Sequence, residues 1–141
     1  MAHLDPYLNF NGNAYEVFSF YKSVFGGEFQ TVMQNKDVPA EYQKMVDSDD
    51  FVWHIALEIA PGNYLMGSDT PNTMGKTTSG TNFSISINAD SKEEADRLFK
   101  ALSAGGTTVM PMDQAFWGSY FGMLNDKFGI QWMVSFGDEK K

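Results

Sequence analysis

The sequence predicts an α+β fold made of two pseudo-symmetric β-α-β-β-β modules, whose sheets face a shared cleft. A helix-like stretch that ends in Gly26-Gly27 recurs as one that ends in Gly105-Gly106. A strand-like segment at 62–68 (GNYLMGS) returns at 129–135 (GIQWMVS), and Gly, Met and Ser match at a constant offset. Internal self-similarity of this kind decides the architecture before any local pattern does.

The composition fits a globular protein and excludes several functional classes. The chain has 141 residues, no cysteine and a net charge of −8, and its ten basic residues are scattered. Phosphate binding needs clustered Lys and Arg, so we expect no nucleic-acid partner. The lack of cysteine excludes a disulfide framework, a thiolate zinc site and a cysteine nucleophile. No signal peptide opens the sequence and no apolar run approaches ~20 residues, so we expect a cytoplasmic protein without a membrane partner.

The first half reads as one complete module. Residues 4–10 have the pattern of a strand, and they run into the turn Asn11-Gly12-Asn13. Asn13 and Glu16 have the spacing of a capping box, and apolar residues then recur at helical spacing as far as Phe25. Strands are expected at 28–34, 51–59 and 63–68. The polar stretch 36–50 is a loop with room for one helical turn, long enough to act as a flap, and its Asp47, Asp49 and Asp50 indicate a solvated acidic turn.

The second half repeats this order. A linker rich in Gly, Thr, Ser and Asn covers 70–81, and a strand is expected at 82–88. Ser91 and Glu94 can cap the following helix, and Gly105-Gly106 ends it. Strands follow at 107–110, 119–125 and 130–136. The predicted domain organisation is therefore a first module at 1–69, a linker at 70–81 and a second module at 82–141.

Several motifs resemble one known superfamily along essentially the whole chain. They are Pro6-Tyr7-Leu8-x-Phe10-x-Gly12-Asn13-Ala14, Phe20-Tyr21-x-x-Val24-Phe25-Gly26-Gly27, Leu65-Met66-Gly67-Ser68-Asp69, Trp117-Gly118-x-x-Phe121-Gly122 and Asp126-Lys127-Phe128-Gly129-Ile130-x-Trp132-Met133. With the doubled β-α-β-β-β order, they resemble the vicinal oxygen chelate superfamily of glyoxalase I, bleomycin-resistance proteins and dioxygenases. Within it they resemble the demethylubiquinone methyltransferase-like, phosphonate-associated subgroup. The resemblance implies a homodimer. Because no glycine-rich nucleotide motif follows a strand, we do not expect a methyltransferase.

The resemblance also implies where a metal would bind. Metal enzymes of the superfamily carry His or Glu ligands on the first and last strands of each module, which map approximately onto Asp5, Met66, Asn82 and Met133. Met66 and Met133 are mates in the repeat, and Asp5 and Asn82 become mates when Asn11 is aligned with Asn88. Thioethers are soft and uncharged ligands, and one Asp with one amide cannot complete a catalytic set. We therefore expect no metal and no cofactor.

Strand alternation sorts side chains between the helix and the cleft. In strand 82–88, Phe83, Ile85 and Ile87 are expected to pack on the helix, and the alternating polar residues to face the cleft. In strand 51–59 the residues expected to face the cleft are His54, Ala56 and Glu58. The predicted ligand-binding residues are Asp5, Tyr7, Tyr64, Met66, Ser68, Asn82, Ser84, Trp117, Gln131 and Met133. Buried hydroxyls and amides need a partner, which favours a polar small molecule, and the alternative is a face that water alone solvates.

Two side chains are candidates for catalysis. His54 can serve as a general acid or base, and the alternative is a hydrogen-bonded structural histidine. Its repeat mate is Phe121, which would make the site asymmetric. Glu58 is a candidate base or a partner of His54, or else an exposed carboxylate at a strand end. Trp117 is expected either to stack on a ligand or to pack.

The sequence thus favours a protein that binds a polar small molecule in its cleft without a metal, either as a binding module or as an enzyme of unassigned chemistry. Two alternatives stay open. One is a metal-dependent lyase, isomerase or dioxygenase, and the other is a structural or regulatory dimer without catalysis. The fold by itself carries no information on the substrate, because one scaffold hosts many reactions.

Overall fold

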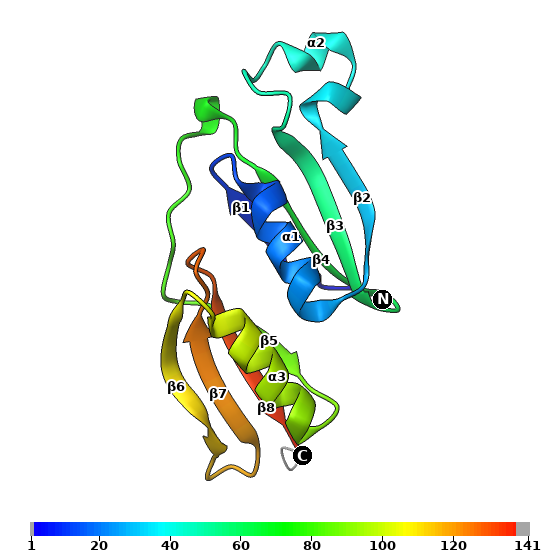
Figure 1. The fold of residues 1–141 in the computed structure, drawn as a ribbon. Coiled ribbons are helices and arrows are strands. Elements are labelled where there is room, and N and C mark those ends of the chain that lie inside the picture. Colours follow the sequence, from blue (N-terminus) through cyan, green and yellow to red (C-terminus); the bar gives the residue numbers. More distant parts are fainter. Residues whose placement is uncertain (1, 138–141) are drawn as a thin grey trace. The chain divides into compact units, whose positions relative to one another are not determined.

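The computed structural model describes residues 2–137 and separates into two compact units, which divide between Thr78 and Ser79. Each unit contains one four-stranded mixed sheet with a 12-residue helix against one face (Figure 1). The element order within each is strand, helix, strand, strand, strand. The structure therefore confirms an α+β fold of two β-α-β-β-β modules.

The first module is built from four strands in the order β1-β4-β3-β2. Its main elements are β1 (Tyr7–Phe10), α1 (Ala14–Phe25), β2 (Glu28–Gln34), β3 (Val52–Ala60) and β4 (Asn63–Asp69). β1 runs parallel to β4, and the other neighbours are antiparallel. Between β2 and β3 lie a 3₁₀ turn at Asn35–Asp37 and the short helix α2 (Ala40–Gln43), and a second 3₁₀ turn covers Asn72–Met74.

The second module repeats this topology with the order β5-β8-β7-β6. Its elements are β5 (Ile85–Asn88), α3 (Lys92–Ser103), β6 (Thr107–Gln114), β7 (Tyr120–Asn125) and β8 (Gln131–Phe136). β5 and β8 are parallel, and the remaining pairs are antiparallel.

The apolar periodicity of each helix explains the core of its module. α1 buries Ala14, Val17, Phe18, Tyr21 and Val24 on one side, and strands β3 and β4 pack against it. α3 buries Ala95, Leu98 and Leu102 against its own sheet, where Leu124, Trp132 and Val134 are also buried. Each large apolar side chain removed from water contributes roughly 1.5–3 kcal/mol. The opposite face of each sheet carries no helix of its own module (Figure 1).

Matching strand registers define which residues are equivalent in the two modules. Tyr7 lies opposite Met66, and Ser86 lies opposite Met133. With Met66 and Met133 as mates, Tyr7 corresponds to Ser86 and Asp5 to Ser84. The predicted pairing of Asp5 with Asn82 is therefore wrong by two residues, because aligning Asn11 with Asn88 ignored the register of the parallel strands.

Two glycines at the helix ends show the same equivalence. A Cβ on Gly27 would overlap the carbonyl oxygen of Glu58, and a Cβ on Gly106 would overlap that of Asn125. The chain leaving each helix thus passes directly against the backbone of a neighbouring strand, which requires glycine. Glu58 and Asn125 occupy corresponding positions, since they pair with Tyr64 and Gln131 respectively.

The two helices begin differently. The Ser91 hydroxyl accepts a hydrogen bond of 3.0 Å from the Glu94 backbone N–H, which confirms the predicted cap of α3. Asn13 makes no such bond, and the predicted Asn13–Glu16 capping box is wrong. Instead, Oδ1 of Asp69 accepts the backbone N–H groups of Gly12 and Ala14, each at 2.9 Å. A residue distant in sequence therefore caps α1.

The strand boundaries differ from the predicted ones where a side chain or a proline interrupts the backbone hydrogen bonding between strands. β1 begins at Tyr7, after Pro6, and β5 begins only at Ile85, because the Gln131 amide rather than a backbone group donates to the Phe83 carbonyl. β6 continues to Gln114 through Pro111, which an edge strand with a register shift tolerates.

One predicted side-chain orientation is also wrong. Phe83 lies outside β5 and is 56% exposed, so it does not pack on the helix. Ala56 faces away from the helix as predicted, since it pairs with Met66 in register, but it is only 1% exposed because its small side chain lies between Thr31 and Met66.

Candidate functional site

The face of the first sheet opposite α1 brings several predicted site residues together. Register places Tyr7 on β1, His54 and Glu58 on β3, and Tyr64, Met66 and Ser68 on β4 on this face. All of these side chains are half-buried or exposed. We call this surface the first open face. Alternation predicted its membership correctly, because a regular antiparallel ladder fixes which side chains share a face.

Tyr7 and His54 form a direct pair across this face. The Tyr7 hydroxyl lies 3.3 Å from Nδ1 of His54, and the two rings stack with centroids 5.7 Å apart and planes inclined by 23°. The strand between them is β4, so the pair spans β4. With Nδ1 accepting from the phenol, the imidazole carries its proton on Nε2, which remains available as a donor.

Glu58 and Tyr64 form a second pair on the neighbouring strands. They lie directly opposite one another in the register of β3 and β4. The negative charge of Glu58 raises the pKa of the Tyr64 hydroxyl above its usual value of 10.0, and the hydrogen bond between the two side chains acts in the same direction. Glu58 also accepts the Gly62 backbone N–H at 3.1 Å, which holds the turn between β3 and β4.

The predicted partnership of Glu58 with His54 does not form. The two residues are four positions apart along β3, a rise of about 13 Å. Each has another partner, Tyr7 for His54 and Tyr64 for Glu58. Alternation in the sequence placed both residues on one face correctly. It could not show which side chains on that face are close enough to pair.

Asp5 joins this face from the segment before β1. Its charge contributes to the raised pKa of Tyr64, and its Oδ1 lies 2.9 Å from Nε2 of His3. The first open face thus carries two carboxylates, two phenols and one imidazole, and none of strands β1 to β4 contains Lys or Arg. A ligand on it meets hydrogen-bonding groups with an acidic bias.

On the corresponding face of the second sheet, neutral side chains replace the titratable groups of the first, and Asp113 on the edge strand β6 joins this face opposite Phe121. Ser84, Gln131 and Met133 occupy the positions of Asp5, Tyr64 and Met66. Ser135 donates a 2.9 Å hydrogen bond to Oδ1 of Asn88, so it is satisfied internally. The mate of His54 is Phe121, as predicted, since the two lie opposite Ser68 and Ser135 in corresponding registers.

The remaining predicted residues of the second module lie outside its strands. Asn82 is exposed and precedes β5 by three residues. Trp117 sits in the turn between β6 and β7, is 39% exposed, and makes edge-on contacts with Phe116 and Phe121 at centroid distances of 4.9 and 5.2 Å. Trp117 therefore borders the open face of its own sheet through Phe121.

The donor set at the positions that the resemblance assigns to a metal does not fit one. Of the four positions, Asp5 supplies the one carboxylate, Asn82 is an exposed amide before β5, and Met66 and Met133 are thioethers. In register, Tyr7 lies opposite Met66 and Ser86 lies opposite Met133. Thioethers and an aliphatic hydroxyl are poor ligands for Zn²⁺, Mn²⁺ or Mg²⁺. Within either unit, over residues 2–137, no group of three or more His, Asp or Glu side chains could hold a metal ion.

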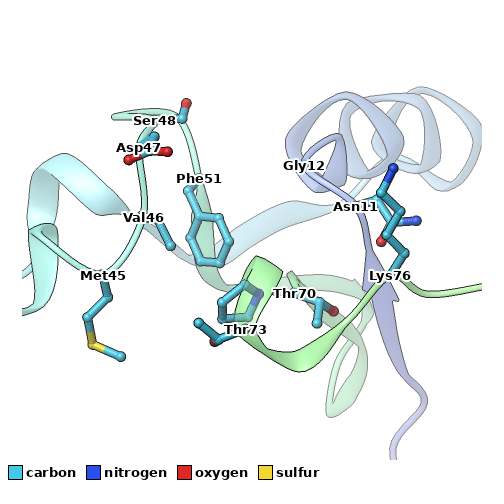
Figure 2. Close-up of a pocket in the computed structure, with 11 residues that line it drawn as sticks. Asn11, Gly12, Met45, Val46, Asp47, Ser48, Phe51, Thr70, Thr73 and Lys76 are labelled. Carbon is cyan, nitrogen blue, oxygen red and sulfur yellow. The ribbon is translucent and has the colours of Figure 1, made fainter.

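A separate cavity of about 280 Å³ lies in the first unit, away from the strand face (Figure 2). Three polar segments form it: the turn before α1, the loop before β3 and the segment after β4. Its lining residues are Asn11, Gly12, Met45, Val46, Asp47, Ser48, Phe51, Thr70, Pro71, Thr73 and Lys76. No pattern in the sequence predicts this cavity. The turn, flap and linker were each visible as polar segments, but only the tertiary structure brings them together.

Comparison with known proteins identifies the family of this chain. The family model described as 3-demethylubiquinone-9 3-methyltransferase matches residues 2–135. The chain belongs to this family. A crystal structure of the protein PA1353 from Pseudomonas aeruginosa is 38% identical, covers 97% of this chain and 98% of that one, and has a TM-score of 0.85.

Two further relatives are similar over most of the chain. Protein YjdN of Escherichia coli is 29% identical over 140 residues, which cover 94% of this chain and 93% of that protein. A glyoxalase/bleomycin resistance protein/dioxygenase family enzyme from Burkholderia phytofirmans is 19% identical, with a TM-score of 0.62 over 96% of this chain and 100% of that one. The last likeness shows a shared fold.

Among the described residues, no helix combines the length and apolar character needed to span a bilayer.

Proposed function

We propose that this protein binds a polar small molecule on the first open face, without a metal. The hydrogen-bonded and stacked pair of Tyr7 and His54 carries the proposal. A half-buried imidazole oriented by a phenol presents a fixed donor or acceptor, and such groups determine the orientation of a ligand. Tyr64 and Glu58 supply further polar groups on the adjoining strands.

The chemistry of these groups indicates what kind of ligand they suit. Nε2 of His54 offers a donor when Nδ1 accepts from the Tyr7 hydroxyl, and an acceptor when Nδ1 donates to it. The Tyr64 hydroxyl is protonated at neutral pH, because the ordinary pKa of a phenol is 10.0 and the charge of Glu58 raises it further. A neutral or cationic molecule rich in hydroxyl, amide or amine groups matches this acidic face better than an anion does. An acid–base step on such a ligand would fall to His54, with Glu58 as a second candidate.

The ligand-binding roles predicted for the second module belong to the same proposal. Ser84, Gln131 and Met133 lie on the open face of their own sheet, Trp117 borders that face, and Asn82 precedes it. Their neutral side chains can make hydrogen bonds and apolar contacts but cannot move a proton at neutral pH. We therefore assign acid–base chemistry to the first module.

A thermal-shift screen of polar metabolites tests the proposal directly. A ligand that binds the folded protein raises the melting temperature by mass action. Hits are then measured on Tyr7→Phe and His54→Phe. Tyr15→Phe serves as the matched control, since Tyr15 lies on α1 and its ring is tilted against that of Phe29. We expect both site variants to lose the shift and the control to keep it. If every hit stabilises His54→Phe as strongly as the unchanged protein, the assignment is wrong.

The metal-free part of the proposal has its own test. Thioether and hydroxyl positions should not hold a divalent ion, so adding Mn²⁺, Ni²⁺ or Zn²⁺ should leave the melting temperature unchanged, and a chelator should do the same. Elemental analysis of protein purified without a chelator should find no metal near chain stoichiometry. Stoichiometric Mn, Fe, Ni or Zn would favour a metal-dependent lyase, isomerase or dioxygenase instead.

We further propose that the protein is a cytoplasmic homodimer without methyltransferase activity. Exposed apolar side chains on the edge strand β6, Val109 and Met110, support an interface between chains. The sequence has no glycine-rich nucleotide motif after a strand to cradle S-adenosylmethionine. Light scattering should give twice the chain mass, and S-adenosylmethionine should produce no thermal shift. A monomer at micromolar concentration would contradict the dimer.

A further inference from the structure

The cavity of about 280 Å³ in the first unit has opposite charges on opposite sides. Figure 2 shows Asp47 and Ser48 above one end, Lys76 with Asn11 at the other, and the Phe51 ring between them. Asp47 is the carboxylate and Lys76 the cation among the described lining residues. Over residues 2–137, neither side chain takes part in an ion pair.

Hydrogen bonds hold the Lys76 side of this cavity in place. The Asn11 amide nitrogen donates to the Thr77 carbonyl at 3.0 Å, and the Thr77 backbone N–H donates to Asn11 Oδ1 at 2.8 Å. The Thr70 backbone N–H donates to the Phe10 carbonyl at 2.8 Å. The segment 70–77 is therefore fixed at both ends against the turn before α1, and this fixes the backbone that carries Lys76.

The Asp47 side is fixed by its own turn. The Asp50 backbone N–H donates to the Ser48 hydroxyl at 3.2 Å, and the Phe51 backbone N–H donates to the Ser48 carbonyl at 3.2 Å. Asp69, which is 3% exposed, connects the Lys76 side of the cavity to the Asp47 side. Its Oδ1 accepts the Gly12 backbone N–H, and its Oδ2 accepts the Val52 backbone N–H at 2.9 Å. The cavity is thus framed by bonds that do not depend on a ligand.

The lining between the charged ends is mixed. Phe51, Val46 and Pro71 present apolar surface, and Thr70 and Thr73 present hydroxyls. A ligand that joins an anionic and a cationic end through an apolar spacer matches this order of groups. A simple anion is disfavoured, because the chain carries a net charge of −8 and Asp47 stands in the same cavity.

We propose that this cavity binds a small zwitterion of the ω-amino acid type, whose carboxylate pairs with Lys76 and whose ammonium pairs with Asp47. The methylene spacer then lies over Phe51. This site is distinct from the first open face, and it concerns a second ligand rather than the one proposed above.

The test uses 6-aminohexanoate as the probe and amide chemical shifts of the full-length protein as the readout. Hexanoate and hexylamine, which carry one charge each, are the matched analogues. We expect 6-aminohexanoate to shift the amides of Gly12, Ser48, Thr70 and Thr73, and to bind more tightly than either analogue. Shifts at Tyr7, His54 and Tyr64 instead would place the probe on the open face and overturn the proposal.

Charge-neutral variants sharpen the test. Lys76 and Asp47 are both exposed, so Lys76→Gln and Asp47→Asn should fold normally. Each should weaken 6-aminohexanoate binding by about two- to fivefold, as expected for an exposed charge pair. Lys44→Gln and Asp49→Asn, which change charge in the same loop outside the lining, should leave affinity unchanged. Equal affinity for hexanoate, no effect of either cavity variant, or no shift at millimolar probe would each overturn the proposal.

Discussion

The two modules of this protein share a topology and differ in the chemistry of their open faces. Where the first has Asp5, Tyr7, His54, Glu58 and Tyr64, the second has Ser84, Ser86, Phe121, Asn125 and Gln131. Every titratable group of the first set is thus replaced by a neutral one. The methionine pair Met66 and Met133 stays the same. The repeat preserves the scaffold, and only the first of these two sets contains an imidazole and phenols.

The modules also differ in how buried aspartates stabilise them. Asp69 accepts the backbone N–H groups of Gly12, Ala14 and Val52, and so joins α1 to β3 and β4. In the second module Asp126 accepts the N–H groups of Phe128 and Ile130 and the indole N–H of Trp132. The first carboxylate connects elements distant in sequence, whereas the second organises one local turn between β7 and β8.

The largest effect is expected from removing these carboxylates. Asp69→Ala and Asp126→Ala each leave three donors without their acceptor, and an unsatisfied buried donor costs roughly 1–3 kcal/mol. Each variant should therefore lose about 3 kcal/mol or more of unfolding free energy in urea. Hydrogen exchange should locate the loss in α1 and β3 for Asp69→Ala, and in the β7–β8 turn for Asp126→Ala.

Asp49→Ala is the control for both variants, because Asp49 is exposed. It should change the unfolding free energy by under about 0.5 kcal/mol. A loss of less than about 1 kcal/mol in either buried-aspartate variant would show that water replaces the carboxylate, contrary to this account.

The next effect concerns the asymmetry of the open faces. His54→Phe gives the first module the residue that the second carries at Phe121. Affinity for a ligand found by thermal shift should fall about tenfold or more, near 1.4 kcal/mol, while the protein's own melting temperature changes little. Calorimetry measures the affinity, and a thermal scan without ligand measures the melting temperature. Undiminished affinity would mean that the imidazole contributes nothing to recognition.

A smaller effect separates the two helix starts. Ser91→Ala removes the side chain that caps α3 and should destabilise the protein by about 1 kcal/mol. Asn13→Ala should cost far less, because Asp69 and not Asn13 caps α1. Urea unfolding of the two variants side by side provides the comparison. Equal losses would indicate that Asn13 caps its helix in solution.

The smallest effect concerns one phenol in each module. The pKa of Tyr64 is raised mainly by the charge of Glu58, and that of Tyr120 mainly by its hydrogen bond to Asp96. A pKa raised in the folded state stabilises the fold below the ordinary value of 10.0, and this contribution is lost as the pH rises through the folded pKa.

Salt and substitution should separate these two causes. Salt screens exposed charges, so it should lower the pKa of Tyr64 more than that of Tyr120. Glu58→Gln should lower the pKa of Tyr64, and Asp96→Asn that of Tyr120. Tyrosine ring carbon shifts followed by NMR through alkaline pH measure both values. A pKa of Tyr64 that is insensitive to Glu58→Gln would contradict the assigned cause.

The sequence was sufficient to predict the fold because the repeat and the periodicities are local patterns. The Gly26-Gly27 and Gly105-Gly106 stops and the order of elements all appear in the structure. Membership of the first open face also followed, since strand alternation fixes it. Long-range bonds were not predictable: Asp69 capping α1 and Gln131 replacing a backbone donor at Phe83 both join residues more than forty positions apart.

In the candidate sites, too, local patterns were predictable and long-range contacts were not. Tyr7, His54 and Tyr64 were identified from alternation, but their pairing depends on the parallel register of β1 with β4, which no local pattern gives. The charged cavity was missed because its lining comes from three polar segments that look like ordinary loops. The sequence around Asp47 predicts only a solvated turn, and the fold places this residue across the cavity from Lys76 (Figure 2).

Methyl NMR on methionine-labelled protein tests the central claim most directly, because each sheet carries its own methionines on its open face. Met66 lies opposite Tyr7 in the first module, and Met133 lies opposite Met123 in the second. With a ligand from the thermal-shift screen, this account predicts that the Met66 methyl signal shifts and that His54→Phe abolishes the shift. A response confined to Met123 and Met133, with Met66 unchanged, would contradict it.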